Sequence, residues 1–291
     1  MPERLDAHTV LVAFMADPAR HSMSPTMHNE AFAKLGLNYA YLAFEVPSQR
    51  LGAAIEAVRA LGLRGAQISM PHKQAVIQHL DALGPAVELC GAVNTVVNDD
   101  GVLTGHTTDG IGFMKALDEE GIDIRGGKMT LTGAGGAATA IAAQAALDGL
   151  AELAIFQREG ASLAKARRSA ELINERTTCT ATVHLLEDRA DLRREIADSA
   201  IYCDATPLGM GALEGATLVS DPAWFRRDMV VFDAVYAPRT TRLMQVARAA
   251  GVRHVLNGLG MLLWQGAESF RLWTHEDMPV DYIRGLLFAE R

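Results

Sequence analysis

The chain has no excess of positive charge. Its 291 residues include 27 Lys and Arg against 35 Asp and Glu, for a formal net charge of −8. Such an acidic protein lacks the electrostatic footprint for nucleic acid or an anionic membrane, so we expect neither as a partner. An anionic ligand would therefore need a local positive site.

Cysteines are also scarce. Cys90, Cys179 and Cys203 form no CxxC pair and no cluster with histidine at the spacing of zinc ligands. We expect buried, reduced thiols and no bound metal. The first six residues lack the basic and apolar regions of a signal peptide, which favours a cytoplasmic protein.

Long uncharged runs are rare as well. The run 129–147 carries no charge and could suggest a membrane span. It is rich in Gly and Ala and has a turn near its start. We therefore expect a buried strand, a turn and a helix there.

The length predicts two domains, and the patterning predicts an α/β fold for both. In the first half, short apolar runs alternate with helical patterns. Pro25–Leu35 is the first expected helix, with Ser24 as a possible N-cap. Asn98–Gly101 is expected to form a turn. The expected strands of this mostly parallel sheet are Val10–Met15, Tyr39–Phe44, Gly65–Ile68, Thr95–Val97 and a hairpin return at Val102–Gly105.

A second α/β unit begins near Lys128. Its expected strands are Met129–Leu131, Leu153–Phe156, Ile201–Cys203, Val230–Phe232 and His254–Leu256. Its expected helices are Gly135–Leu150, Leu163–Asn174 and Thr241–Ala250. The end of the chain, Met261–Trp273 and Val280–Ala289, is helical without a further strand, so it could pack back on the first domain.

A glycine-rich turn follows the first strand of that unit and precedes a helix. Its pattern is GxGGxA, a variant of the dinucleotide fingerprint. The glycines allow the backbone to approach a pyrophosphate, which the helix N-terminus can bind. No Gly-Lys-Ser/Thr follows, which excludes a Walker A loop. The candidate cofactor-binding residues are Gly133, Ala134, Gly135, Gly136 and Ala137.

The next strand ends in two residues of opposite charge, Arg158 and Glu159. An acidic residue here can accept from the ribose 2′-hydroxyl and repel a 2′-phosphate, whereas an arginine favours the phosphate. The two signals conflict. We expect NAD to be preferred over NADP, with use of both as the alternative.

Four polar clusters lie at expected strand ends of the first domain, where ligands of α/β sheets gather. Together they offer hydroxyls, an amide, an ammonium and a carboxylate, a set that can bind a polyhydroxylated acid. Each could also be only a cap, a turn or a solvated charge. The clusters are His21–Pro25, Ser69–Lys73, Gly91–Thr95 and Thr107–Gly110.

Taken together, these clusters and the glycine-rich turn resemble motifs of the shikimate dehydrogenase family. The motifs HSMSP, SMPHK, AVNTV, TTDG, GAGGAA and NGLGMLLWQGA occur in the family's order over essentially the whole chain. Residues 97–101 and 261–273 look most like the quinate/shikimate dehydrogenase branch. The resemblance implies a substrate-binding domain of residues 1–113 and 262–291 around a Rossmann-like dinucleotide-binding domain of residues 114–261.

The resemblance also implies residue roles. Lys73 and Asp109 would be the catalytic acid–base pair. Ser22, Ser24 and Tyr236 would bind the substrate carboxylate. Ser69, Asn94 and Gln265 would bind ring hydroxyls. Thr206, Gly258 and Met261 would complete the cofactor site.

Several positions depart from the family's usual pattern. Gln67 and Asp204 stand where asparagine is usual, and Ser69 replaces a frequent threonine. Thr107 replaces a frequent asparagine, and Gln157 precedes Arg158 where asparagine is usual. Because Ser69 and Thr107 are close to the expected site, they bear on the choice of ring substrate.

The expected reaction is hydride transfer between NAD (or NADP) and a hydroxylated cyclic carboxylic acid, as in aromatic amino acid biosynthesis. A free lysine titrates near about pH 10.4, so a lysine base needs a partner to act near neutrality. Asp109 would be that partner. We expect the enzyme to interconvert shikimate and 3-dehydroshikimate. A further expected reaction is the interconversion of quinate and 3-dehydroquinate.

Other functions stay open on sequence alone. They are an aminoshikimate or other cyclic polyol dehydrogenase, and a metabolite-binding regulator without activity. A folate-linked methylene dehydrogenase would have tyrosine where Ser69 stands, four residues before the lysine. The expected assembly is a monomer or a homodimer.

Overall fold

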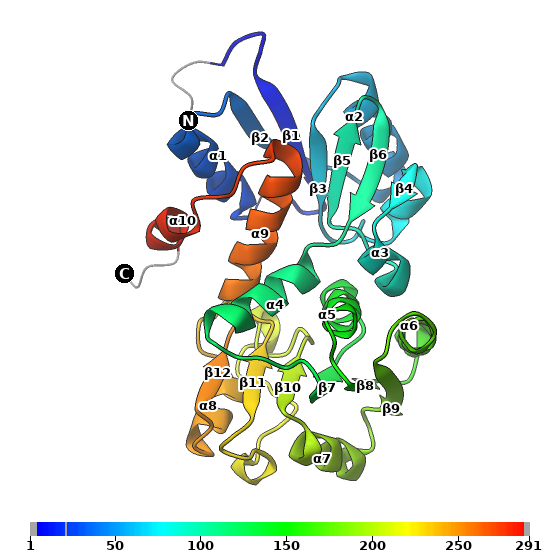
Figure 1. Cartoon of the computed structure of the whole chain (residues 1–291), viewed down its shortest axis with the longest axis vertical. Coiled ribbons are helices and arrows are strands. Elements are labelled where there is room, and N and C mark those ends of the chain that lie inside the picture. Colours follow the sequence, from blue (N-terminus) through cyan, green and yellow to red (C-terminus); the bar gives the residue numbers. More distant parts are fainter. Residues whose placement is uncertain (1–4, 21, 288–291) are drawn as a thin grey trace. The chain divides into compact units, whose positions relative to one another are not determined.

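The computed structural model describes residues 5–20 and 22–287, which form two compact units (Figure 1). The first unit comprises Met1–Gly112 and Leu263–Arg291, and the second Phe113–Leu262. Phe113 and Leu262 thus belong to the second unit, one residue beyond each expected boundary. Phe113 belongs there because its ring packs edge-on against Phe232, with 4.8 Å between centroids. His21 of the first polar cluster lies outside the described residues, as do residues 288 and 289 of the last expected helix.

The first unit contains a mixed six-stranded sheet in the order β2-β1-β3-β5-β6-β4. The first three strands in this order run parallel, whereas β5 is antiparallel to both β3 and β6. The strands are β1 (Val10–Ala16), β2 (Tyr39–Glu45), β3 (Gly65–Ile68), β4 (Ala82–Leu83), β5 (Thr95–Asp99) and β6 (Val102–His106).

Helices cover both faces of this sheet (Figure 1). On one face, Phe32, Phe270 and Trp273 pack with Val12 and Phe14 of β1. The terminal helices therefore join the first unit's core, as the sequence predicts. The helices of this unit are α1 (Ser24–Leu35), α2 (Leu51–Ala60), α3 (Pro85–Cys90), α9 (Leu259–Thr274) and α10 (Val280–Leu287).

Two local expectations for this unit change. Ser24 is the first residue of α1, and Met23 occupies the N-cap, so Ser24 is not the cap. The expected turn at Asn98–Gly101 is tighter, because Asn98 and Asp99 still belong to β5. Asp100 and Gly101, with φ of 53° and 92°, make the turn, and both are residue types that tolerate this conformation.

The second unit contains a parallel six-stranded sheet in the order β12-β11-β10-β7-β8-β9. In chain order this is 6-5-4-1-2-3, the arrangement of dinucleotide-binding sheets, with its switch point between β7 and β10. The strands are β7 (Lys128–Thr132), β8 (Glu152–Gln157), β9 (Thr180–Leu185), β10 (Ile201–Asp204), β11 (Val230–Asp233) and β12 (His254–Leu256).

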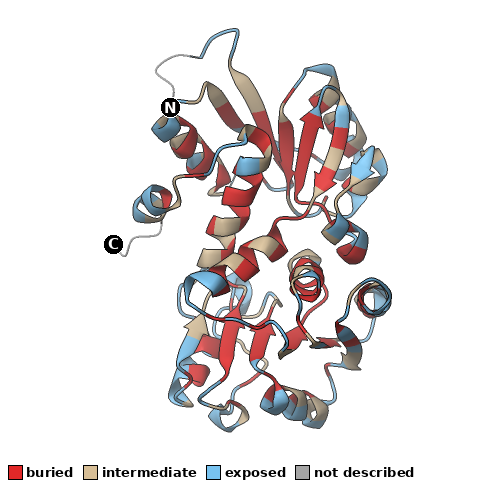
Figure 2. Cartoon of the chain, in the orientation of Figure 1, coloured by how far each residue is buried: buried red, intermediate tan, exposed pale blue. Residues whose placement is uncertain are grey.

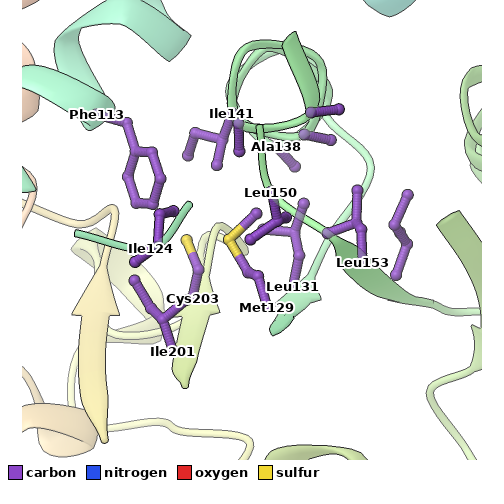
Figure 3. Close-up of a cluster of buried hydrophobic side chains, with 14 of the residues drawn as sticks. Phe113, Ile124, Met129, Leu131, Ala138, Ile141, Leu150, Leu153, Ile201 and Cys203 are labelled. Atoms are coloured by element: carbon purple, nitrogen blue, oxygen red, sulfur yellow. The ribbon is translucent and has the colours of Figure 1, made fainter. Parts of the chain in front are cut away.

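Helix α5 (Gly136–Leu147) is buried almost all round (Figure 2). Figure 3 shows Ala138 and Ile141 of α5 in one hydrophobic cluster with Leu131 of β7 and Cys203 of β10. The uncharged run 129–147 thus forms the expected strand, turn and helix. The unit's other helices are α4 (Asp109–Glu119), which begins in the first unit, α6 (Ala161–Arg176), α7 (Arg189–Asp198) and α8 (Arg242–Ala249).

The three cysteines are free and buried, as expected. Burial raises the pKa of the Cys90 and Cys179 thiols to about 11, which keeps both protonated near neutrality. Within residues 5–20 and 22–287, no helix has the length and apolarity needed to cross a bilayer.

Candidate active site

The polar clusters lie at one edge of the first unit's sheet, where strands β3 and β6 end and strand β5 begins. Strand β3 ends there and leads into Ser69. Because β5 is antiparallel to β3, its beginning at Asn94–Thr95 lies at the same edge. Strand β6 runs antiparallel to β5, so its end leads Asp109 to that edge as well. Strand directions thus bring together segments that are far apart in the sequence.

Lys73 and Asp109 form an ion pair at this edge. The Lys73 Nζ donates to Asp109 Oδ2 at 2.6 Å. The two side chains are 20% and 10% exposed, respectively. The backbone carbonyl of Lys73 accepts from Val93 N at 2.7 Å, which ties the lysine's loop to the segment that carries Asn94. The ion pair is therefore partly shielded from water, and the backbone of Lys73 is fixed by its hydrogen bond from Val93.

Asn94 connects this pair to the rest of the network. Its Nδ2 donates to Asp109 Oδ1 at 3.0 Å and to Thr108 Oγ1 at 2.9 Å. Its Oδ1 accepts from Thr108 N at 2.8 Å. Asp109 therefore has one donor on each carboxylate oxygen. A role in a turn alone does not account for these contacts, because the Asn94 side chain is buried and its hydrogen bonds are made to site residues.

Gln265 reaches the same network from α9. Its Oε1 lies 3.4 Å from Asn94 Nδ2 and accepts from Gln67 Nε2 at 2.9 Å. Ser269, one turn further along α9, contacts Thr95 Oγ1 at 2.7 Å and Thr108 Oγ1 at 3.0 Å. Helix α9 thus closes one side of a buried polar cluster.

Three serines are expected to bind the substrate: Ser22 and Ser24 in the HSMSP motif, and Ser69 in the SMPHK motif. Ser22 Oγ accepts from Ser24 N at 3.2 Å, which shapes the entry to α1. Ser24 is 6% exposed and begins the helix, with no side-chain cap at its N-terminus among the described residues. Ser69 N donates to Met15 O at 3.0 Å and continues β3 beyond its last residue.

Several members of the network were not expected from the sequence. Tyr41 reads as an ordinary aromatic residue of an apolar strand, and Ser269 as a polar residue within a helical pattern. Only their burial, 0% exposed for both, marks them as functional candidates. Gln67 was noted as a departure from the usual asparagine but received no role. The unexpected members are Tyr41, Gln67 and Ser269, whereas Thr95 and Thr108 lie in two of the polar clusters named from the sequence without a role of their own.

In the second unit, the glycine-rich turn is shaped for close approach of another group. Gly133 has φ of +108°, and a Cβ there would lie 2.9 Å from Ala205 O. A Cβ on Gly135, by contrast, would meet nothing within 4 Å, so the space in front of α5 is open. Among the described residues, no side chain caps the N-terminus of α5. Its first backbone N–H groups can therefore bind a pyrophosphate.

The other expected cofactor residues lie around this sheet. Arg158 and Glu159 follow β8 and are exposed. Thr206 follows β10, where its N–H donates to Asp204 Oδ1 at 2.9 Å. Gly258 is buried, and a Cβ there would lie 2.1 Å from Ala234 O, so only glycine fits. Met261 packs into the second unit's hydrophobic core.

Tyr236 also belongs to the second unit. It lies beyond β11 and is 37% exposed. Its ring therefore presents surface to solvent, unlike the buried tyrosines Tyr41 and Tyr202.

Family comparisons agree with these features. Residues 14–96 match the shikimate dehydrogenase substrate binding domain, and residues 258–288 match the shikimate 5′-dehydrogenase C-terminal domain. The chain is 54% identical, over 100% of its length and 99% of the relative, to shikimate dehydrogenase (NADP(+)) of Streptococcus uberis.

Solved structures are similar as well. Shikimate 5-dehydrogenase from Listeria monocytogenes, in complex with shikimate and NAD, is 55% identical, with 99% of each chain covered and a TM-score of 0.95. Quinate dehydrogenase from Corynebacterium glutamicum, in complex with NAD, is 29% identical, with 95% of this chain and 97% of that chain covered and a TM-score of 0.84.

The parallel sheet with its glycine-rich turn and the lysine–aspartate pair define a nicotinamide-dinucleotide-dependent oxidoreductase. The full-length identity then narrows the class: the chain belongs to the shikimate dehydrogenase family.

Proposed function

We propose that this enzyme interconverts shikimate and 3-dehydroshikimate, with Lys73 and Asp109 as the acid–base pair. The observation that carries the proposal is the 2.6 Å contact between Lys73 Nζ and Asp109 Oδ2 within a buried network of Asn94 and Gln265. The relatives above 50% identity named as shikimate dehydrogenases support this choice of substrate.

A bound nicotinamide dinucleotide supplies the hydride acceptor or donor. During oxidation, the substrate hydroxyl must lose its proton as its carbon loses the hydride. Lys73, as the amine, takes that proton, and Asp109 then accepts a hydrogen bond from the resulting ammonium. During reduction, the Lys73 ammonium gives the proton to the substrate's carbonyl oxygen. Asp109 and Asn94 keep the lysine in place in both directions.

The remaining residues bind the ring. Ser22 and Ser24, at the start of α1, bind the carboxylate with help from the helix N-terminus. Tyr236 is the third residue proposed to bind it. Ser69, Asn94 and Gln265 bind ring hydroxyls. A hydroxyl shielded by the ligand and left unpaired is costly, so Ser69 would reject analogues that lack the matching hydroxyl.

For the cofactor we propose use of both dinucleotides, with NAD preferred. The exposed Glu159 beside Arg158 supports this preference, because a carboxylate repels a 2′-phosphate. The Streptococcus uberis and Listeria monocytogenes relatives both carry NADP(+) in their names, and the Listeria structure contains NAD, which supports the use of both dinucleotides. The proposed cofactor site comprises Gly133 to Ala137, Arg158, Glu159, Thr206, Gly258 and Met261.

Quinate is the second candidate substrate. The similarity to the Corynebacterium quinate dehydrogenase favours it, although that identity is only 29%. Ser69 and Thr107, which replace usual residues near the ring site, make a change in ring preference physically reasonable.

Initial rates for shikimate and for quinate, each with NAD and with NADP, test the proposal. We expect catalytic efficiency to be highest with shikimate. Turnover of quinate alone would move the enzyme to the quinate branch, and turnover of neither would refute the proposed function.

A further inference from the structure

Two buried residues, Tyr41 and Gln67, extend the hydrogen-bond network around Gln265. The Tyr41 hydroxyl donates to Gln67 Oε1, and Gln67 Nε2 donates to Gln265 Oε1 at 2.9 Å. A continuous path thus runs from Tyr41 through Gln67 to Gln265.

From Gln265 the path continues to the ion pair. Gln265 Oε1 lies 3.4 Å from Asn94 Nδ2, and Asn94 Nδ2 donates to Asp109 Oδ1 at 3.0 Å. Asp109 in turn accepts from Lys73. Side-chain hydrogen bonds therefore connect Tyr41 of β2 to the Lys73–Asp109 pair.

Tyr41 is held rigidly in this path. Its ring is fully buried and stacks on His28, with 4.6 Å between centroids and 11° between planes. Burial raises the pKa of Tyr41 well above its usual value, so the hydroxyl keeps its proton. Burial also lowers the pKa of His28 to about 3, so the stacked imidazole stays neutral near pH 7.

The path determines how Gln265 can serve a ligand. A carboxamide has an acceptor oxygen and a donor nitrogen on opposite sides. With Tyr41 donating to Gln67 Oε1, only Gln67 Nε2 is left to face Gln265, and it requires an acceptor there. Gln265 must therefore turn its oxygen toward Gln67, which turns its amide nitrogen to the other side.

We propose that Gln67, supported by Tyr41, is a positioning residue that orients the Gln265 carboxamide so that it donates to an oxygen of the ring substrate. This inference rests on the proposed function. An asparagine at position 67 is one methylene shorter and would not span the same distance between Tyr41 and Gln265. The departure from the family's usual asparagine thus has a structural consequence in this chain.

A double-mutant cycle tests the proposal. Gln67→Glu keeps an acceptor for Tyr41 but presents an oxygen to Gln265, which forces that amide to rotate. We expect the KM for shikimate to rise about tenfold, with a smaller change in kcat. In a Gln265→Ala background the same change should alter KM less than about twofold, because the carboxamide through which residue 67 acts on the substrate is absent.

Two further variants make the result decisive. Tyr41→Phe removes only the hydroxyl and should raise KM about threefold, again only when Gln265 is present. Gln78→Glu makes the same chemical change on an exposed residue of the same unit and should leave KM unchanged. Melting temperatures of all variants show whether each one folds.

The outcomes separate the two claims. Effects of Gln67→Glu and Tyr41→Phe that are equal with and without Gln265 would overturn the positioning role. Absence of shikimate turnover in the unaltered protein would instead overturn the proposed function.

Discussion

At the scale of single residues, Asp109 is held by a hydrogen bond on each of its carboxylate oxygens. One carboxylate oxygen accepts from Lys73 at 2.6 Å and the other from Asn94 at 3.0 Å. Charge-assisted hydrogen bonds of this kind fix direction as well as distance. Lys73 consequently points where Asp109 and Asn94 hold it, which is what a proton donor needs before a substrate arrives.

The two serines before α1 should act mainly in binding. Replacing both Ser22 and Ser24 by alanine removes two hydroxyls but leaves the backbone donors of the helix N-terminus. We expect the KM for shikimate to rise by about 10- to 100-fold, as for the loss of two hydrogen bonds that contribute about 0.7–1.4 kcal/mol each. Steady-state kinetics measures it, and a loss of kcat with unchanged KM would contradict uniform binding by these serines.

Cofactor choice is also decided by single residues. Glu159→Thr removes the carboxylate expected to repel a 2′-phosphate while Arg158 remains. Like charges near a protein surface repel by about 1–4 kcal/mol at roughly 4 Å. The ratio of kcat/KM with NADP to that with NAD should therefore rise about tenfold or more. A ratio that stays constant would mean that Glu159 points to solvent and selects nothing.

At the scale of elements, strands β10 and β11 end in two buried carboxylates. Asp204 and Asp233 are direct neighbours in the register of the parallel sheet. Asp233 accepts from Val235 N at 3.0 Å and from Thr241 Oγ1 at 2.5 Å. Burial, with the nearby Asp204 charge as a further cause, raises the pKa of Asp233 to about 6. Burial likewise raises the pKa of Asp204.

These raised pKa values make stability fall as the pH increases. The unfolded state ionises Asp233 near its usual value of 3.8, whereas the folded state resists ionisation until about pH 6. Stability from this group is therefore complete below about pH 4 and is lost as the pH rises through 6. The whole loss corresponds to about 3 kcal/mol.

Asp204→Asn tests this account. The amide keeps an acceptor for Thr206 N and removes the neighbouring charge, so the pKa of Asp233 should drop. We expect the variant to be more stable at pH 8 by about 1–2 kcal/mol and to have a flatter melting temperature between pH 4 and 7. Glu214→Gln, at an exposed position of the same unit, is the matched control. Parallel curves for Asp204→Asn and the unaltered protein would contradict the account.

The sequence predicts the central strands of both sheets and the edge strands β2 and β12, but it misses the edge strands β4 and β9. β7 and β10 are covered by helices on both faces, so they are short apolar runs bounded by turns. β9, at the sheet edge, alternates polar and apolar residues, as in Thr180, Thr182 and His184, and was not predicted. β4 has only two residues and lacks any periodic signal.

At the scale of the whole molecule, the chain's motifs predict candidate site residues but not the residues that these contact. Gln67 and Gln265 are 198 residues apart in the sequence, and Asn94 and Gln265 are 171 residues apart. No local pattern predicts such pairs, because sheet order and the return of α9 create them. Tyr41 was missed for the same reason: an aromatic residue in an apolar strand predicts core packing, not a hydrogen bond to Gln67.

The measurement that tests the central claim most directly is the turnover of Lys73→Ala with shikimate, together with its affinity for the cofactor. If Lys73 moves the hydroxyl proton, kcat should fall by about 10²- to 10⁴-fold, the usual size of an acid–base contribution. The dissociation constant of the dinucleotide should change less than about twofold, because no part of the glycine-rich turn is altered. Near-normal turnover in this variant would contradict the assignment of Lys73 and Asp109 as the acid–base pair.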